Sequence, residues 1–118
     1  EERATTICIL HGCAKEDPAN TRMICQTSGL LSSLVDSAVT GKLSSREIYF
    51  KYIELLLRML SDITNHLYLQ DHTELLPWLA TFANAMTSND GLKQQVVRAI
   101  IQLSKCFLDQ GVTNRVLV

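Results

Sequence analysis

The stretch ANTRMICQTSGLLSSLVDSAV, residues 19–39, decides the fold because its internal spacing recurs along the chain. Its first copy consists of Asn20, Ile24, Gly29-Leu30-Leu31 and Leu34. The second copy consists of Asn65, Leu69, Glu74-Leu75-Leu76 and Leu79. A third copy begins with Asn114 and Val118. A repeat of about 45 residues, one supersecondary unit long, is typical of a helical solenoid, in which a unit buries its apolar face against a neighbour.

Length and composition indicate one globular domain with little net charge. The 118 residues are enough for a single core, and 47% hydrophobic with 19% charged residues is ordinary for a globular protein. The formal net charge of -1 gives no diffuse attraction to phosphate backbones or anionic lipids. No apolar run approaches the roughly 20 residues of a transmembrane helix. Neither nucleic acid nor a membrane is therefore an expected partner.

Cysteine usage favours a reducing compartment. Cys8, Cys13, Cys25 and Cys106 lie within apolar helical stretches, without a CxxC pair or the dense spacing of a disulfide scaffold. We therefore expect an intracellular protein of the cytoplasm or nucleus. Because residues 3–15 already have the pattern of the last helix of a unit, we also expect the chain to be a piece of a larger protein.

Apolar periodicity, glycine and proline divide the chain into helices. Helices are predicted over residues 3–15, 20–27, 30–39, 45–64, 65–72, 75–86 and 92–108, and no stretch reads as a strand. Gly29 should provide a sharp bend, and Ser44 with Glu47 reads as a capping box. The apolar side of helix 45–64 covers more than half of its circumference, which predicts burial between neighbours on two sides.

This order of short helix, bend, middle helix, loop and long helix resembles the armadillo repeat, the three-helix unit of importin α and β-catenin. The family pattern of an alanine- and leucine-rich long helix, Asn-x-x-x-Ile and Gly-(Leu/Ile)-(Leu/Pro)-x-Leu-Val is matched at two places. The first match is Leu10, Ala14, Asn20, Ile24, Gly29-Leu30-Leu31 and Leu34-Val35. The second match is Leu60-Ser61, Asn65, Leu69 and Leu75-Leu76-Pro77-Trp78-Leu79.

The resemblance implies an all-α fold, an α-α superhelix of the armadillo-like right-handed solenoid type, with about two and a half repeats. Residues 1–118 would form a single helical-repeat domain. Within it, residues 3–15 would be the last helix of a preceding repeat, 19–64 and 65–109 two repeats, and 112–118 the start of the next.

Departures from the family pattern bear on the partner. Glu74 replaces the bend glycine in the second unit. In importin-like members, an asparagine on each long helix clamps the backbone of an extended peptide, and a tryptophan stands one turn earlier. The asparagine positions correspond here to Gly12, Met59 and Gln102, and the tryptophan positions to Cys8, Leu55 and Arg98. Of these, only Gln102 could hold a peptide amide, so the resemblance implies a protein-binding scaffold but not a nuclear-localisation-signal receptor.

The sequence contains no constellation that predicts a metal centre or a nucleophile. Cysteine and histidine are the usual zinc ligands, and the candidates here are Cys8, His11, Cys13 and Cys25. Cys13, however, lies two residues beyond His11 and points to another side of the helix. The same geometry argues against Cys13 and His11 as a nucleophile with its base. Buried structural thiols are the expected alternative, and we expect neither a metal nor a cofactor.

The polar side of helix 45–64 consists of Glu47, Lys51, Glu54, Arg58 and Asp62. Glu47 and Glu54 share a helix face and could be read as a carboxylate pair for acid-base catalysis. Each of them, however, has a cation four residues further on, which favours a solvated, salt-bridged surface. We therefore expect a protein that is not an enzyme.

The expected function is a non-enzymatic scaffold that binds a partner peptide or helix along the concave face of the long repeat helices. The residues expected to line this face are Leu55, Arg58, Met59, Asp62, Arg98, Gln102 and Lys105. Leu55 and Met59 favour a groove because they place apolar side chains on an otherwise charged face.

Three alternatives stay open. These residues could form an ordinary solvated helix face. The chain could be a structural spacer of a longer solenoid, or a self-association module that forms homo-oligomers through open repeat ends. A four-helix bundle is the third alternative, and it would have longer helices of similar length and no bend at Gly29.

Overall fold

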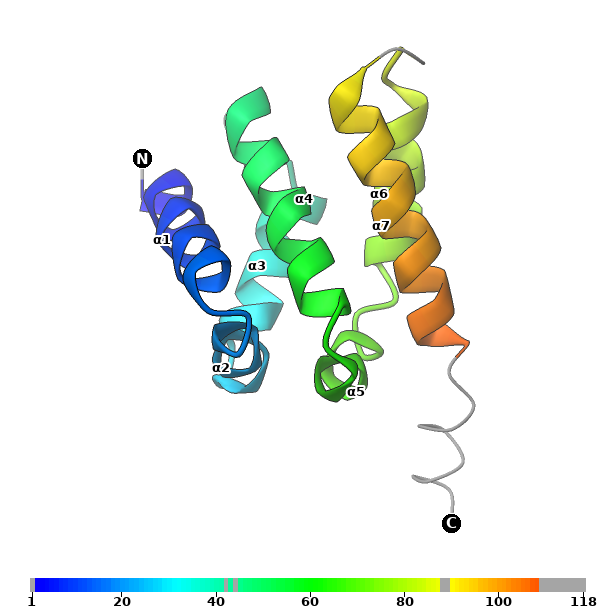
Figure 1. Cartoon of the computed structure of the whole chain (residues 1–118). Coiled ribbons are helices and arrows are strands. Elements are labelled where there is room, and N and C mark those ends of the chain that lie inside the picture. The colour runs from blue at the N-terminus through cyan, green and yellow to red at the C-terminus, as the bar shows by residue number, and fades with distance from the viewer. Residues whose placement is uncertain (1, 42, 44, 88–89, 109–118) are drawn as a thin grey trace.

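The described part of the chain is folded into helices that are joined by short loops (Figure 1). The computed structural model describes residues 2–41, 43, 45–87 and 90–108. In chain order the helices are α1 (Glu2–Glu16), α2 (Asn20–Gln26), α3 (Leu30–Val39), α4 (Arg46–Leu60), η1 (Ile63–Asn65), α5 (His66–Leu69), α6 (Leu75–Asn84) and α7 (Gly91–Phe107). Because no strand occurs in the described residues, the prediction of an all-α fold is confirmed.

The ends of α4 differ from the prediction. Its N-cap is Ser45, whose Oγ accepts a hydrogen bond from the Ile48 N–H at 3.3 Å. The N-cap therefore lies one residue after the predicted Ser44, and Ile48 rather than Glu47 occupies N3, so the predicted capping box is wrong. Two adjacent serines can each cap a helix, and sequence alone does not choose between them. Ser44 itself lies outside the described residues, as does the predicted new unit at 112–118.

At its other end, α4 stops at Leu60 rather than at residue 64. Asp62 has an extended backbone (φ -106°, ψ 113°), and its Oδ1 accepts a hydrogen bond from the Thr64 N–H at 3.0 Å. The Asp62 side chain thus caps the short helix η1 instead of continuing α4, which is a common role of aspartate at a helix start.

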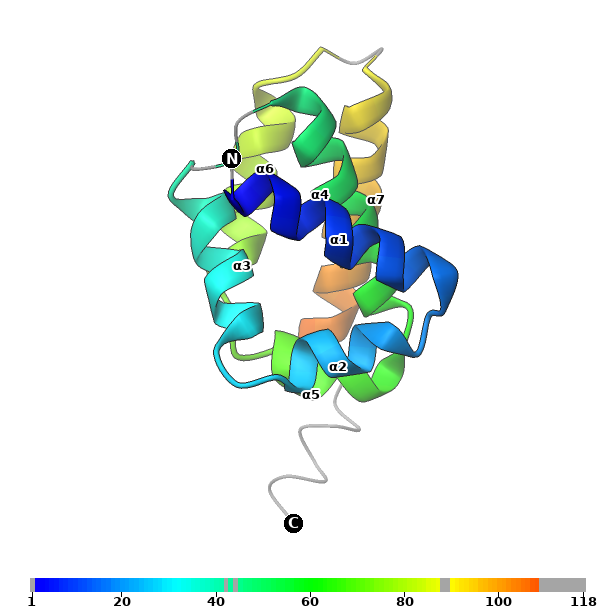
Figure 2. The ribbon, with the colours of Figure 1, turned by 90° about the vertical axis from the view of Figure 1, so that its left-hand side faces the viewer.

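The three long helices α1, α4 and α7 lie side by side, with α4 between the other two (Figure 1). The middle-length helices α3 and α6 lie behind this layer and contact each other, and the short helices α2 and α5 do the same at one end of the molecule. Figure 2 shows the same arrangement from the α1 side. Helix α2 therefore packs beside α5, α3 beside α6 and α4 beside α7, and the predicted burial of α4 between two neighbours is confirmed.

Gly29 makes the bend between α2 and α3. Its φ of +78° lies in the left-handed region, which is open to glycine at little cost, so the predicted bend is confirmed. At the equivalent place, Glu74 keeps a right-handed conformation (φ -68°, ψ -17°), so the chain enters α6 without a left-handed residue. The α-helices run from 4 residues in α5 to 17 in α7, so the structure lacks the features expected of a four-helix bundle.

The core is one cluster of apolar side chains contributed by the described helices of both units. Ile53, Leu56, Leu69, Leu75 and Leu79 are among its most deeply buried members. No helix in the described part of the chain combines the length and apolar character that crossing a membrane would need.

Candidate functional site

Leu55 and Met59, the two apolar residues expected to line a groove, lie in the core. Their exposed fractions are 1% and 3%, and the Met59 Sδ lies 3.6 Å from the Cys25 Sγ. The prediction that they line a binding face is therefore wrong. Neighbouring helices cover α4 on several sides, and the side that carries Leu55 and Met59 is one of the covered sides.

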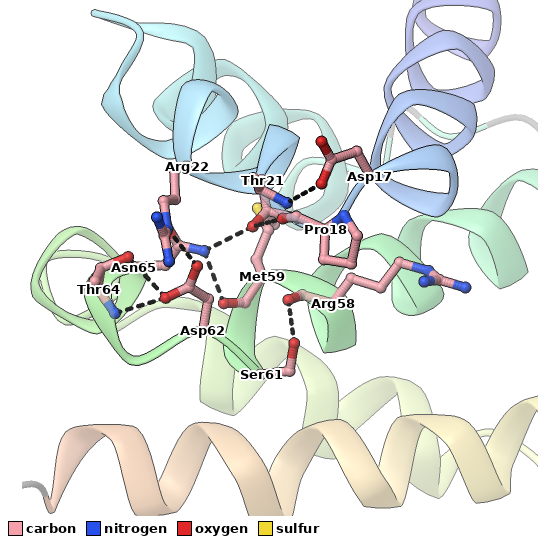
Figure 3. A network of polar contacts seen from close by, with 11 residues as sticks. Asp17, Pro18, Thr21, Arg22, Arg58, Met59, Ser61, Asp62, Thr64 and Asn65 are labelled. Carbon is pink, nitrogen blue, oxygen red and sulfur yellow. Dashed lines mark hydrogen bonds and ion pairs between the residues drawn. The ribbon is translucent and has the colours of Figure 1, made fainter.

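Asp62 also lies away from the expected face. Its carboxylate accepts hydrogen bonds from the Thr64 hydroxyl at 2.7 Å and from Arg22 Nε of α2 at 2.6 Å (Figure 3). The Thr64 hydrogen bond first, and then the Arg22 guanidinium, lower the pKa of Asp62 to about 2. The assignment of Asp62 to a partner surface is therefore corrected: the side chain joins α2 to the turn after α4.

The side of α4 that faces solvent carries a different set of residues. Its members recur every three or four positions, so they share one side of the helix. They are Glu47, Phe50, Lys51, Glu54, Leu57, Arg58 and Ser61. Among the residues predicted for the site, Arg58 is the one α4 member that lies on this side.

On α7, the predicted residues Arg98, Gln102 and Lys105 are exposed, and Ile101 beside them is 50% exposed. The Arg46 guanidinium of α4 forms an ion pair with Asp90, the N-cap of α7, at a sequence separation of 44. Pairs of residues with this separation are buried in both helices, namely Ile48 and Leu92, Tyr52 and Val96, Leu55 and Ala99, and Met59 and Leu103. Both helices therefore turn the same side to the core and the same side to solvent.

We call the solvent sides of α4 and α7 together the long-helix face. It consists of the seven α4 residues given above and of Arg98, Ile101, Gln102 and Lys105. In this register Arg58 lies level with Gln102, and Glu54 lies level with Arg98.

A groove of about 520 Å³ opens on the α1 side of the long-helix face. It is lined by His11, Arg46, Glu47, Phe50, Lys51 and Glu54. Phe50 is 37% exposed and is the apolar residue of this otherwise polar lining. Sequence reasoning missed Phe50, although the signal was present: it is the aromatic residue within the charged strip that begins at Glu47. We call this opening the Phe50 groove.

Polar contacts join α1 to α4 at the groove. The His11 Nε2 lies 3.3 Å from the Glu54 Oε1, and the Lys51 Nζ lies 3.6 Å from the Cys8 Sγ. Both contacts join residues with a sequence separation of 43, so α1 and α4 run parallel in a fixed register.

The ion pairs on α4 agree in part with the prediction. Glu47 and Lys51 form the expected pair, at 3.6 Å. Glu54 contacts His11 instead of Arg58, and the described residues contain no ion pair between Glu54 and Arg58. Arg58 is therefore left as a cation on the face.

The cysteines and histidines do not gather into a reactive site within the part of the chain that the structure describes. That part contains no group of three or more histidine, cysteine, aspartate or glutamate side chains able to hold a metal ion. Cys25 and Cys106 are buried thiols as expected, whereas Cys8 is half-buried and Cys13 is exposed. Burial first, and the Asp62 charge second, raise the pKa of Cys25 to about 12, so it is a neutral thiol at ordinary pH.

The candidate functional site is therefore the long-helix face together with the Phe50 groove. Of the residues predicted for it, the structure places Arg58, Arg98, Gln102 and Lys105 on the solvent side of neighbouring helices. Comparisons of this chain with protein-family models, with curated proteins and with solved structures found no significant match.

Proposed function

We propose that this chain is a non-enzymatic scaffold, built as a segment of an armadillo-like right-handed solenoid, that binds a partner protein along the long-helix face. The observation that carries the proposal is the equivalence of the two units: long, short and middle helices each pack beside their counterparts. Such stacking leaves the outward sides of successive long helices next to one another, as in repeat proteins that bind extended partners.

The two asparagines support this equivalence. The Asn20 Nδ2 donates to the Cys13 carbonyl near the end of α1 at 2.8 Å, and the Asn65 Nδ2 donates to the Met59 carbonyl near the end of α4 at 3.0 Å. Each asparagine therefore ties the segment after a long helix back to the last turn of that helix. The Asn65 Nδ2 also donates to the Thr21 Oγ1 at 3.0 Å, which joins the second unit to the first (Figure 3).

The dimensions of the face suit an extended segment. Packed helices lie about 8–10 Å apart, so a partner that crosses from α1 over α4 to α7 spans about 20 Å, the length of about six extended residues. Phe50 and Ile101 offer apolar contacts along this path, and the charged side chains around them give polar ones. Aromatic residues in such positions commonly dominate binding energy.

Selection from a displayed library of random peptides tests this function without assuming a partner. We expect the selected peptides to perturb the NMR signals of Phe50, Arg58 and Gln102. Phe50→Ala should weaken their binding by about tenfold, the effect of losing one aromatic anchor. Ile63→Ala is the matched control, because Ile63 is 61% exposed but lies on η1, outside the face.

Circular dichroism would verify that both variants keep their helical content. Selected peptides that bind elsewhere, or that bind the Phe50→Ala variant as tightly as the parent chain, would overturn the proposal.

Self-association is a second candidate function, favoured by apolar side chains on the outermost helices. Ile9 of α1 is 59% exposed and Met23 of α2 is 68% exposed. At the other end of the row, Val97 of α7 is 39% exposed, although Ile53, its equivalent in α4, is fully buried. These outer sides of α1, α2 and α7 resemble the sides by which α4 packs against its neighbours, and they would suit another helical unit.

A further inference from the structure

We infer that the partner of the long-helix face is an acidic, extended protein segment. This inference rests on the proposed function and adds the chemistry of the partner. It comes from the distribution and the pairing of charges in the described part of the chain.

Basic side chains gather on the long helices, although the chain as a whole has a formal net charge of -1. The cations of the long-helix face are Lys51, Arg58, Arg98 and Lys105. Most described carboxylates lie instead in loops, in caps or on α3, namely Asp17, Asp36, Asp62, Asp71, Glu74 and Asp90. The positive character of the face is therefore a local property and does not reflect the average composition.

The arginines inside and outside the face differ in their pairing. Arg22 and Arg46, which lie outside it, form ion pairs with Asp62 and Asp90. The hydrogen bond from Arg46 is the main reason why the pKa of Asp90 falls to about 2. The two described arginine side chains outside the face are thus paired, whereas Lys93, also outside it, donates to the Met86 carbonyl at 3.3 Å.

On the face, Arg58, Arg98 and Lys105 have no carboxylate partner among the described residues. The two carboxylates of the face are already engaged, Glu47 with Lys51 and Glu54 with His11. A surface with unpaired cations is complementary to an acidic ligand, which would supply the missing counter-charges.

Neighbouring uncharged groups complete the surface. The amide of Gln102 lies level with Arg58 and can both donate to and accept from a peptide backbone. The Phe50 groove, which lies on the α1 side of α4, offers an apolar contact. A partner that suits this surface therefore has carboxylates opposite the three cations. It also has one apolar side chain for the Phe50 groove, at most about six extended residues from those carboxylates.

The same chemistry argues against a nucleic acid on this face. The cations are few, the net charge is negative, and Glu47 and Glu54 stand beside the groove. A continuous polyanion would meet these carboxylates, whereas a peptide can place its acidic residues away from them.

The test uses a fluorescent peptide in which one leucine is followed by glutamates alternating with serines, and a companion peptide with glutamine in place of each glutamate. We expect the chain to bind the acidic peptide at least about tenfold more tightly, with an affinity that falls as salt is added. The triple variant Arg58→Gln, Arg98→Gln, Lys105→Gln should lose about tenfold or more of this affinity.

Arg22→Gln is the matched control, because it removes one exposed cation outside the face and should change the affinity by less than about twofold. Thermal denaturation of the triple variant should show only a small loss of stability, since the three cations have no carboxylate partner to lose among the described residues and only Arg58 and Lys105 lie in the last turn of a helix. Arg58→Glu combined with Arg98→Glu should shift the preference to a peptide with lysine in place of glutamate.

Equal binding of the acidic and glutamine peptides, or unchanged binding by a folded triple variant, would overturn the inference. Tighter binding of oligothymidylate than of the acidic peptide would also overturn it, in favour of a nucleic-acid surface. Neutral or basic library peptides that bind the face would overturn this inference but leave the proposed function intact. Library peptides that bind only outside the face would overturn both.

Discussion

At the residue scale, one buried amide connects α2 to the end of α4. Asn65 is 0% exposed, and its Nδ2 donates both to the Met59 carbonyl and to the Thr21 hydroxyl, which is also fully buried. Inside a protein, a polar group whose partner is removed keeps its desolvation cost without its hydrogen bond. Removing Asn65 would therefore leave two buried acceptors without this donor, although the buried Asn65 Oδ1 itself has no hydrogen-bond partner in the described structure.

We predict that Asn65→Ala lowers the free energy of unfolding by about 2–3 kcal/mol, because it leaves the Met59 carbonyl and the Thr21 hydroxyl without this donor. Urea denaturation followed by circular dichroism would measure the change. Asn20→Ala is the matched control and should cost about 1 kcal/mol, because Asn20 makes the equivalent bond at a half-buried position. A larger loss for Asn20→Ala than for Asn65→Ala would contradict the proposed junction.

At the element scale, the sequence predicted each α-helix of the described part, but it assigned the residues of η1 to the two helices on either side. Gly29 was recognisable as a bend because glycine readily adopts positive φ. The start of α4 was misplaced because Ser44 and Ser45 are chemically alike as caps. Its end was misplaced because Asp62 can either extend a helix or cap the next turn, and contacts with Arg22 and Thr64 stabilise the second choice.

We predict opposite effects for two glycine substitutions. Gly29→Ala should lower the free energy of unfolding by roughly 1–2 kcal/mol, because alanine is disfavoured at a φ of +78°. Gly12→Ala, within α1, should raise it by about 0.5–1 kcal/mol, because alanine is the better helix former there. An added Cβ meets no atom within 4 Å at either position, so the contrast isolates the backbone. Chemical denaturation would measure both, and a stabilising Gly29→Ala would show that the bend does not require glycine.

At the scale of the whole molecule, packing decides which sides of the helices stay free. α4 has neighbours on both flanks and keeps one exposed side, whereas α1 and α7 have one flank each without a described neighbour. The side-by-side packing of α1, α4 and α7 that forms the long-helix face therefore also leaves apolar side chains exposed on the outer flanks of α1 and α7.

We predict that the chain, of 13.2 kDa, self-associates through these ends as its concentration rises. Val97→Lys should weaken this association by about tenfold, because it places a charge at the end surface. Gln102→Lys is the matched control, since it adds the same charge to α7 on the long-helix face. Sedimentation equilibrium would measure both, and equal association of the two variants would exclude Val97 from the contact.

The sequence by itself determined the all-helical fold, the repeated asparagines and the polar strip that contains Glu47, Lys51, Glu54 and Arg58. These follow from local chemistry: apolar spacing, turn residues and charge pattern act over a few neighbouring positions. Only the tertiary structure decided that Leu55 and Met59 lie in the core and that Arg58, Arg98 and Lys105 keep no carboxylate partner among the described residues. Burial and charge pairing depend on which helices pack against each side of α4, and those helices lie about 40 residues away along the chain.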